Sequence, residues 1–343
     1  MSTVDAQLRR VFDDGIAHAE AFDDDYHELW LGLARAGEGG KRFRPALVTG
    51  IYRALGGKDL PLAVRVGAAI ELLHTAFVIH DDVIDGDDTR RGQLNVTGTF
   101  TGRARSSGAD EHDAAAFGRT AGILAGDLAL VAAIRAVALA AAPPIMTERL
   151  LDLVDRAVRV TAAGELADVR HSLSRQAVPL GQILTMEEHK TAVYSFELPL
   201  QAGAVLAGAD EALVRGLGDF GRLVGIGFQL LDDLQGVFGD EAATGKSALS
   251  DLREGKLTPL VAHARSTAAW PQIAPFVVDR GLTEPRAAIA RDLLTGCGSR
   301  HFIEDLAASY VAAALDLAEH LDLPPDFLTW VTAMTADLTR RAA

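Results

Sequence analysis

The sequence predicts an all-α protein, and three features of its 343 residues support this prediction. Hydrophobic residues make up 49% of the chain, and alanine and leucine, which favour helix, dominate them. Helix-type segments follow one another, and no stretch shows the apolar–polar alternation of a half-buried strand. No stretch has the length and composition of a linker between domains. We therefore expect one helical domain over residues 1–343 with a large buried core.

Short breaks separate the expected helices. A Gly56-Gly57 pair divides the second from the third, Pro143-Pro144 opens the fifth, and Gly281-Leu282-Thr283 precedes the ninth. The polar stretch Gly102–Asp113 has the composition of a mobile loop. The expected helices are Asp5–Ala36, Arg44–Leu55, Leu60–Asp85, Ala114–Ala141, Pro144–Val169, Met186–Leu206, Asp210–Phe238, Thr258–Thr267, Glu284–Leu294, Ser299–Leu321 and Pro325–Arg341.

Charge and composition exclude several kinds of protein. The net charge of −14, with no basic stripe, excludes a nucleic-acid partner. A single cysteine, Cys297, excludes an internal disulfide and indicates the reducing cytoplasm. Residues Met1–Phe22 are charged and lack the apolar stretch of a signal peptide. The most apolar segment, Ile123–Met146, contains Asp127 and Arg135, so we expect a buried core helix and no membrane span.

Two acidic clusters are the most informative feature of the chain. Asp81-Asp82-Val83-Ile84-Asp85 and Asp232-Asp233 each follow an apolar helical run. Carboxylates are rarely buried unless they are paired or bound to a metal. Asp81 and Asp85 lie one turn apart on a helix and share a face. Two such faces opposed across a cavity form an oxygen-rich cage, which suits Mg²⁺ together with substrate phosphates. The clusters therefore indicate a site that handles a diphosphate.

Lysine is rare, and four of the five lysines stand in short polar motifs. The chain has 33 basic residues, and all the others are arginines. The ammonium group of lysine is a compact point charge for phosphate, whereas arginine presents a planar fork. Chance would scatter lysines over exposed faces, so we interpret these four as phosphate ligands. The motifs are Gly39-Gly40-Lys41-Arg42-Phe43-Arg44-Pro45, Lys190-Thr191, Gly245-Lys246 and Gly255-Lys256-Leu257-Thr258-Pro259.

Five motifs occur in a fixed order along the chain. They are Gly40-Lys41-x-x-Arg44-Pro45, Asp81-Asp82-x-x-Asp85 followed by Arg90-Arg91-Gly92, Lys190-Thr191, Phe228-Gln229-x-x-Asp232-Asp233 and Gly245-Lys246. Together they resemble the motifs of the trans-isoprenyl diphosphate synthases, the head-to-tail prenyltransferases that make geranyl, farnesyl and geranylgeranyl diphosphates. The resemblance extends from about Gly39 to Lys256. One Asp-Asp-x-x-Asp alone would be weak support, whereas five motifs in register are specific.

The resemblance implies a fold, a cofactor and roles for individual residues. The fold would be a single-domain isoprenoid-synthase-like helical bundle around a central deep cavity. Three Mg²⁺ ions would bind with the diphosphate of the allylic substrate. The metal ligands would be Asp81, Asp85 and Asp232, supported by Asp82 and Asp233. The residues expected to act on the allylic diphosphate and its reacting carbon are Arg90, Lys190, Thr191, Gln229, Lys246 and Lys256. Isopentenyl diphosphate would be bound by Lys41, Arg44, His74 and Arg91. Two acidic residues on an earlier helix, Glu165 and Asp168, are interpreted as structural.

The same resemblance implies the reaction. Dimethylallyl, geranyl or farnesyl diphosphate would ionise, and the double bond of isopentenyl diphosphate would attack the allylic cation. Loss of a proton then gives a product one isoprene unit longer. In this family, side chains upstream of Asp81 limit the length of the product. Ala76 is small, while Phe77 and, one turn deeper, Leu73 would narrow the pocket. We expect geranylgeranyl diphosphate, with farnesyl diphosphate as the second choice.

The chain departs from the family pattern at two places, and one of them, Gly236, leaves an alternative open. Gly236 replaces the third aspartate of the second acidic motif, and Gln93–Thr97 stands where the family commonly has proline-x-x-histidine. A non-catalytic or regulatory subunit of a heteromeric prenyl synthase would tolerate Gly236, although such subunits usually lose the first motif too. A terpene cyclase is disfavoured because the second site lacks an Asp-x-x-x-Ser-x-x-x-Glu-like run. A phosphohydrolase that uses His80-Asp81 would leave Asp232-Asp233 unexplained. By family analogy we expect a homodimer.

Overall fold

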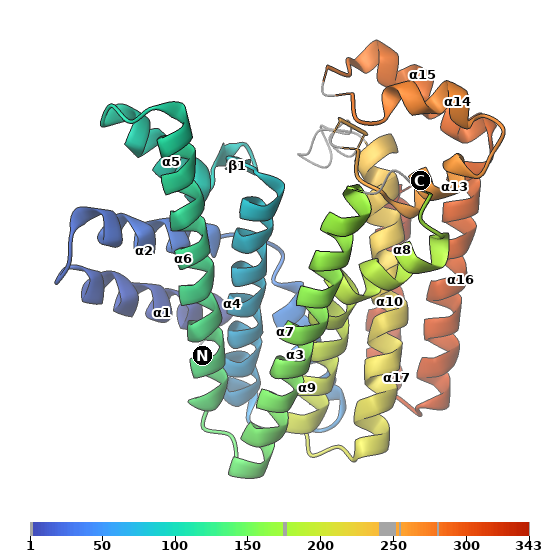
Figure 1. Cartoon of the computed structure of the whole chain (residues 1–343). Helices are drawn as coiled ribbons and strands as arrows, with labels where there is room; N and C mark the ends of the chain where they lie inside the picture. Colours follow the sequence, from blue (N-terminus) through green and yellow to red (C-terminus); the bar gives the residue numbers. More distant parts are fainter. Residues whose placement is uncertain (1–2, 174–176, 240–251, 254, 280, 343) are drawn as a thin grey trace. The chain divides into compact units, whose positions relative to one another are not determined.

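The computed structural model describes residues 3–173, 177–239, 252–253, 255–279 and 281–342, and helices dominate it (Figure 1). This confirms the all-α prediction. In the described part of the chain, the strands are two residues each, β1 (Thr89–Arg90) and β2 (Gln93–Leu94), paired in one antiparallel hairpin. The chain divides into two compact units, one of residues 1–154 and 202–209 and the other of residues 155–201 and 210–343. The single-domain organisation stays a prediction.

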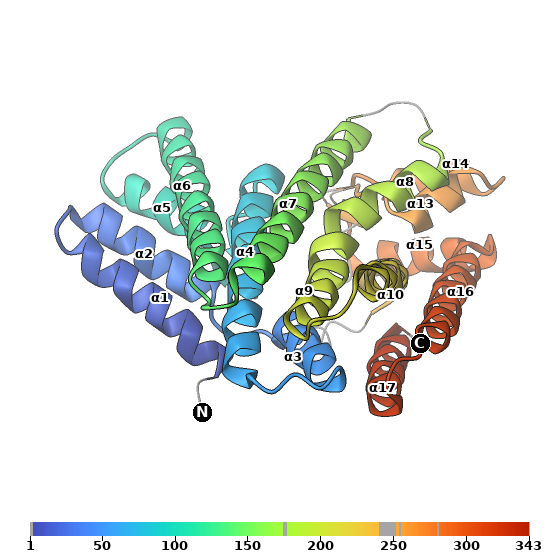
Figure 2. The same cartoon turned by 90° about the horizontal axis from the view of Figure 1, so that it is seen from below.

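The first unit is built around one long apolar helix, α4. Helices α1, α3 and α6 pack against it, and α6 runs beside it in both views (Figures 1 and 2). The α6 helix approaches closely because it carries glycine: a Cβ on Gly126 would lie 2.2 Å from His80 Nε2, and one on Gly122 would lie 2.3 Å from Val83 Cγ2. This packing fixes the acidic end of α4. The elements are α1 (Val4–Ala19), α2 (Asp24–Ala36), α3 (Phe43–Ala54), α4 (Leu60–Asp85), β1, β2, α5 (Val96–Ser106), α6 (Glu111–Ala138) and the start of α7 (Pro144–Ser172).

Polar caps break two segments differently from the prediction. The expected helix Asp5–Ala36 is two helices, because the Asp23 side chain accepts a hydrogen bond from Tyr26 N and starts α2 anew. The expected mobile loop Gly102–Asp113 is mostly helical, because the Asn95 side chain caps α5, which the sequence analysis missed. Between α5 and α6 only residues 107–110 are outside a helix.

The second unit contains an unusual helix in its centre. The expected helix Met186–Leu206 starts earlier, and residues 188–197 form a π-helix, η1, between two α-helices. Glycines of the neighbouring helices allow η1 to approach them, since a Cβ on Gly164 would lie 2.3 Å from Lys190 N and one on Gly225 would lie 2.5 Å from Ala192 Cβ. The elements are the rest of α7, α8 (Leu180–Glu187), η1 (Glu188–Glu197), α9 (Leu198–Leu206, shared between the units), α10 (Glu211–Phe238), α13 (Pro259–Arg265), α14 (Trp270–Ile273), η2 (Ala274–Phe276), α15 (Glu284–Gly296), α16 (Ser299–His320) and α17 (Pro325–Ala342).

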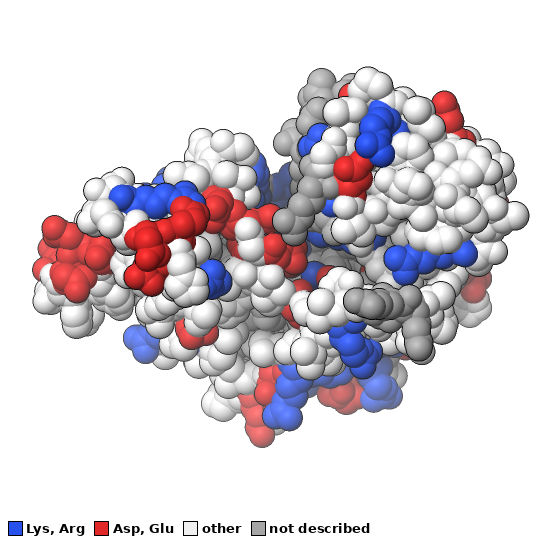
Figure 3. Space-filling model, turned by 45° about the horizontal axis from the view of Figure 1, so that its top comes forward, with Lys and Arg blue, Asp and Glu red and all other residues white. Residues whose placement is uncertain are grey.

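Two helices of the described chain, α4 and α6, are long and apolar enough to cross a membrane by length and composition. In α4, 72% of the apolar window is buried, as expected of a core helix, whereas the figure for α6 is 39%. The break at residues 139–143 agrees with the one expected at Pro143-Pro144, so the apolar helix ends at Ala138. The predicted burial of this helix is wrong, because Ile123 and Val131 are 48% and 63% exposed. Acidic side chains gather on the side formed by α1, α2, α5 and α6 in Figure 3.

Candidate active site

The hairpin that follows α4 holds the acidic end of this helix. Asp81 and Asp85 share one face, and Asp85 is the last helical residue. Arg90 of β1 turns back, so that its Nη2 lies 2.6 Å from Asp82 Oδ1 and 3.3 Å from Asp81 Oδ2. Asp82 is 4% exposed. Burial raises the pKa of the Asp82 carboxyl, and the hydrogen bond from Arg90 opposes that rise. A further cation would stabilise this concentration of negative charge.

The next residue, Arg91, contacts a different partner. Its backbone is left-handed (φ 54°), and its Nη1 donates a hydrogen bond to the Glu38 carbonyl oxygen at 3.2 Å. Glu38 belongs to the basic loop, which we define as residues 37–44. Within this loop Lys41 is exposed, whereas Arg44 is 7% exposed. Arg91 therefore joins the basic loop to the hairpin that carries Arg90.

His74 lies on α4, about two turns before Asp81, close to both of these segments. Burial lowers the pKa of the His74 imidazole well below its usual range, and the charges of four arginines lower it further: Arg44, Arg90, Arg91 and Arg42. The imidazole is thus neutral near pH 7 and offers one N–H donor and one acceptor nitrogen. Its arginine neighbours form a positive region that suits a diphosphate.

The residues expected to limit product length lie in the interior of the first unit. Leu73 is 1% exposed, Ala76 is fully buried, and Phe77 is partly buried. On α4, Ala76 precedes Asp81 by five residues and Leu73 precedes it by eight. A larger side chain at Ala76 must therefore displace its neighbours.

In the second unit, two carboxylates fix Lys190. Its Nζ lies 2.7 Å from Asp168 Oδ2 and 3.1 Å from Glu165 Oε1. Both acidic residues are on α7, while Lys190 and Thr191 are on η1. We interpreted Glu165 and Asp168 as structural, but the structure places them in direct contact with an expected site residue. Their three-residue spacing on one helix face is the signal that could have identified them.

A buried acidic pair lies at the second aspartate motif. Gln229 Nε2 donates to Asp233 Oδ1 at 2.9 Å, and Glu187 shares a side-chain hydrogen bond with the same aspartate. Burial raises the pKa of Glu187 well above its usual range, and the carboxylates of Asp233 and Asp168 add to this effect. Asp232 beside it is partly buried. Glu187 lies outside every motif of the sequence, and its burial follows from packing in the fold.

The remaining expected ligands are the two lysines after α10. Lys246 lies outside the described residues. Lys256 is exposed, and its segment is anchored nearby because Arg253 Nη2 donates to the Leu282 carbonyl oxygen at 2.7 Å. The structure groups the expected residues within each unit. The first unit holds Lys41, Arg44, His74, Asp81, Asp82, Asp85, Arg90 and Arg91, and the second holds Lys190, Thr191, Gln229, Asp232, Asp233 and Lys256.

The donors at both acidic motifs fit a hard divalent cation. They are carboxylate oxygens, which Mg²⁺ prefers. Burial is the first cause of the raised pKa values of Asp82 and Glu187, so a bound cation would offset the cost of ionising these carboxyls. Among the residues that the structure describes, no three His, Cys, Asp or Glu side chains form a ready metal-binding group. Mg²⁺ commonly takes only one or two carboxylates and completes its shell with water and substrate phosphates.

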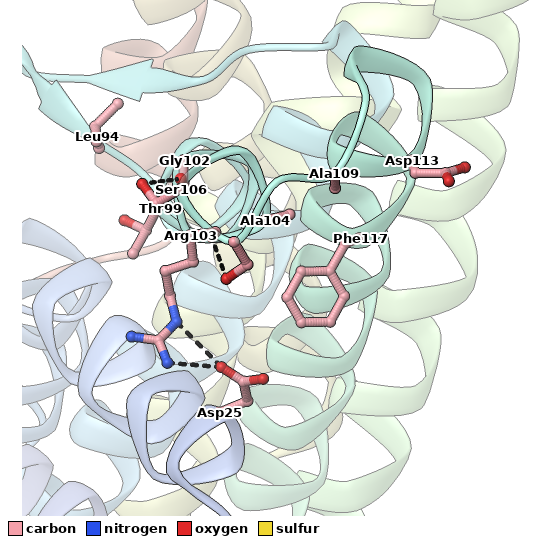
Figure 4. Close-up of a pocket in the computed structure, with 11 residues that line it drawn as sticks. Asp25, Leu94, Thr99, Gly102, Arg103, Ala104, Ser106, Ala109, Asp113 and Phe117 are labelled. Atoms are coloured by element: carbon pink, nitrogen blue, oxygen red, sulfur yellow. Dashed lines mark hydrogen bonds and ion pairs between the residues drawn. The ribbon is translucent and has the colours of Figure 1, made fainter.

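A separate pocket of about 820 Å³ lies between the ends of α5 and α6 (Figure 4). Its one basic side chain, Arg103, donates from Nη2 to Asp25 Oδ1 at 2.6 Å, and Phe117 lines one side. None of the expected site residues lines this pocket. The pocket lining contains one basic and two acidic side chains, so it lacks the excess of positive charge that suits a diphosphate.

Comparison with known proteins agrees with these features. A protein-family model described as polyprenyl synthetase matches residues 33–274. The geranylgeranyl diphosphate synthase of Methanosarcina mazei is 32% identical over 273 residues, which cover 80% of this chain and 77% of that protein. The chain belongs to the polyprenyl synthetase family. The predicted resemblance to trans-isoprenyl diphosphate synthases is confirmed, and the chain is a prenyltransferase by family.

Other family members agree in fold and differ in product. The octaprenyl diphosphate synthase of Escherichia coli is 30% identical over 294 residues, which cover 82% of each protein. The crystal structure of geranylgeranyl pyrophosphate synthase from Corynebacterium glutamicum, complexed with isoprenyl diphosphate and magnesium, is 28% identical. Its TM-score is 0.90, over 98% of this chain and 97% of that one. Family membership therefore fixes the reaction class but not the length of the product.

Proposed function

We propose that this family member condenses isopentenyl diphosphate with an allylic diphosphate, head to tail, and that geranylgeranyl diphosphate is its main product. The observation that carries the proposal is the β1–β2 hairpin. Arg90 contacts the carboxylates of Asp81 and Asp82, while the next residue, Arg91, contacts the basic loop. Head-to-tail condensation needs two diphosphates held close together, and adjacent arginines with separate partners support that arrangement.

In this proposal the two acidic motifs bind Mg²⁺, three ions in all, with the allylic diphosphate. The ligands are Asp81, Asp82 and Asp85 of α4 with Asp232 and Asp233 of α10. When bound, Mg²⁺ stabilises the negative charge that develops on the departing diphosphate. The carboxylates of α4 would hold these ions at the end of the helix, beside the Arg90 guanidinium.

Fixed cations assist as the carbon–oxygen bond breaks and its electron pair stays on the diphosphate oxygen. Asp168 and Glu165 hold the Lys190 ammonium, so it needs little reorganisation to meet the substrate. Arg90, Lys246 and Lys256 complete this set of positive charges. The hydroxyl of Thr191 and the amide of Gln229 present oxygen dipoles to the allylic cation.

Isopentenyl diphosphate is bound by Lys41, Arg44 and Arg91, with neutral His74 donating its one N–H. The double bond of this substrate attacks the allylic cation, and a new carbon–carbon bond forms. A proton then leaves the adjacent carbon for the released diphosphate, which restores an allylic product. No nucleophilic side chain takes part.

In this proposal the length of the product depends on the size of the α4 side chains that face the growing tail. Small, buried Ala76 leaves room for a tail, and Leu73 lies one turn deeper, which favours twenty carbons over the fifteen of farnesyl diphosphate. The M. mazei and C. glutamicum relatives are named as geranylgeranyl synthases, which supports the same choice. The primer would be dimethylallyl, geranyl or farnesyl diphosphate.

We also propose a cytoplasmic homodimer. The face of α6 that turns away from α4 exposes Ile123, Leu124, Val131 and Ile134, each at least 41% exposed. Apolar side chains in a row of this kind mark an interaction surface, and a second copy would cover them. The free thiol of Cys297 agrees with a reducing compartment.

The deciding experiment supplies purified protein with Mg²⁺, isopentenyl diphosphate and each of the three allylic primers in turn. We expect a Mg²⁺-dependent product that mass spectrometry identifies, after dephosphorylation, as a twenty-carbon alcohol. A fifteen-carbon alcohol would select the second choice. The absence of product with every primer would favour a non-catalytic subunit, and Gly236→Asp would then test whether the second motif restores turnover.

The role of the first acidic motif is tested by Asp81→Ala. We expect turnover to fall roughly 1,000-fold, which corresponds to a rise of several kcal/mol in the activation barrier. The thermal midpoint should stay close to that of the natural chain. Asp152→Ala on α7 is the matched control, since Asp152 is exposed and outside both motifs. Near-normal turnover in Asp81→Ala would contradict the proposed metal site.

A further inference from the structure

The basic loop is held in place by a side chain that the family motif leaves unspecified. Arg42 stands between Lys41 and Arg44 and contacts three different segments. Its Nη1 donates to Glu71 Oε1 on α4 at 3.0 Å, its Nε donates to Asp5 Oδ1 on α1 at 2.9 Å, and its Nη2 donates to the Gly37 carbonyl oxygen at 2.9 Å. The guanidinium therefore uses all three of its nitrogens.

Of the two carboxylates that Arg42 contacts, Glu71 is the buried one. The Glu71 side chain is 6% exposed and that of Arg42 is 20% exposed. Glu71 Oε2 is buried and has no hydrogen-bond partner among the described residues, so the ion pair of Arg42 with Oε1 balances the charge of this buried carboxylate. Removing one partner of such a pair leaves an uncompensated buried charge. The contact to α4 is therefore specific to arginine or another cation at this position.

The backbone of Arg42 is also in an uncommon conformation. Its φ is 50° and its ψ is 35°, the left-handed region that side-chain-bearing residues rarely adopt. Gly39 and Gly40 have positive φ as well, so three of four consecutive residues turn the loop sharply. The three side-chain hydrogen bonds stabilise this conformation, which orients Lys41 outward and starts α3 one residue later.

We propose that Arg42 is a positioning residue for the isopentenyl diphosphate site. Glu71 lies one turn before His74 on α4, and Arg42 and Arg44 both act electrostatically on His74. By tying the basic loop to Glu71, Arg42 sets the distance between Lys41, Arg44 and His74. The inference rests on the proposed function, and it assigns Arg42 no contact with the substrate.

The test compares Arg42→Met and Arg42→Lys with the natural chain. We expect Arg42→Met to raise KM for isopentenyl diphosphate roughly 10- to 100-fold, because a small displacement of bound groups is enough for such a loss. KM for the allylic substrate should change by less than about 3-fold. Arg42→Lys keeps a charge near Glu71 but cannot reach three acceptors, so its KM should still rise several-fold. If Arg42→Met does not fold, Arg42→Lys alone decides.

Arg65→Met is the matched control. Arg65 lies on α4, the helix that carries Glu71, is partly buried and donates from Nε to the Ala140 carbonyl oxygen at 2.8 Å. The Arg65→Met variant should lose thermal stability, while its KM values for isopentenyl diphosphate and for the allylic substrate stay unchanged. An unchanged KM for isopentenyl diphosphate in both Arg42 variants would overturn this inference alone. A natural chain that neither binds isopentenyl diphosphate in calorimetry nor condenses it would overturn the proposed function as well.

Discussion

Residues of the same type differ in burial, in ion pairing and in pKa because their surroundings in the fold differ. Asp82 is buried and paired with Arg90, and its pKa is raised, whereas Asp85, three residues on, is exposed. Neighbouring arginines divide their contacts in the same way, since Arg90 contacts carboxylates and Arg91 contacts a backbone carbonyl. Motif positions in the sequence thus become separate electrostatic environments once the chain is folded.

The size of residue 76 provides one test at this scale. Ala76→Phe should shorten the main product from twenty to fifteen carbons, because the added ring narrows the proposed pocket. Since Ala76 is fully buried, we also expect a loss of about 1–3 kcal/mol in stability from overpacking. Product alcohols are sized by mass spectrometry and stability is measured by urea unfolding. An unchanged product distribution in a folded variant would refute the assignment of Ala76.

The charge state of His74 provides a second test at the scale of single residues. Its pKa is lowered well below 6.5, so at lower pH the unfolded chain binds a proton there more readily than the folded chain. Stability should therefore fall as the pH drops below about 6.5, by at most about 1.4 kcal/mol per pH unit for this residue. His74→Gln removes that dependence and should lose less stability between about pH 6.5 and 5. Parallel pH profiles of urea midpoints in the two proteins would contradict the neutral, arginine-flanked histidine.

At the scale of elements, close helix contacts decide where the site residues lie. Lys190 and Thr191 are carried by the π-helix η1, whereas the sequence predicts a regular helix over Met186–Leu206. The π-helix packs closely against Gly164 of α7 and Gly225 of α10. Helical periodicity predicts the existence of such a segment but not a change in its winding, which depends on the partner helices.

Gly225→Val tests this packing. The added side chain would meet Ala192, whose Cβ and Cα would lie 2.5 Å and 2.8 Å from the new Cβ. We expect a loss of about 1–3 kcal/mol in stability and reduced turnover, because Ala192 lies two residues from Lys190. Gly181→Ala is the control, since a Cβ on Gly181 meets no atom within 4 Å. Equal stability and turnover in the two variants would show that the contact does not position η1.

At the scale of the whole molecule, a single chain leaves the apolar face of α6 exposed to solvent. Val131 is 63% exposed, and Leu124, two turns earlier, is 49% exposed. The same helix is 39% buried over its apolar window, although its composition suggested a core helix. The sequence shows how apolar a helix is, but burial depends on what packs against each face.

The combined variant Leu124→Glu, Val131→Glu should convert a dimer into a monomer. Two charges on the proposed interface would have to lose water on association, which costs more than the contact supplies. Analytical ultracentrifugation measures the mass in solution. Ile289→Glu on α15 is the control, because Ile289 is 52% exposed in the other unit. A natural chain that sediments as a monomer would remove the homodimer proposal.

The sequence by itself determined the helical class, the limits of α4 at Leu60–Asp85 and the motif residues, because composition, breaks and fixed spacing are local properties. The family followed from five motifs in register. Only the tertiary structure decided that Asp168 and Glu165 hold Lys190, that Glu187 is buried beside Asp233, and that Arg42 ties the basic loop to Glu71. These contacts join residues 22 to 46 positions apart, or depend on burial, and pKa values follow from such neighbours and not from residue type. Local patterns thus specify which groups are present, while packing determines their charge and position.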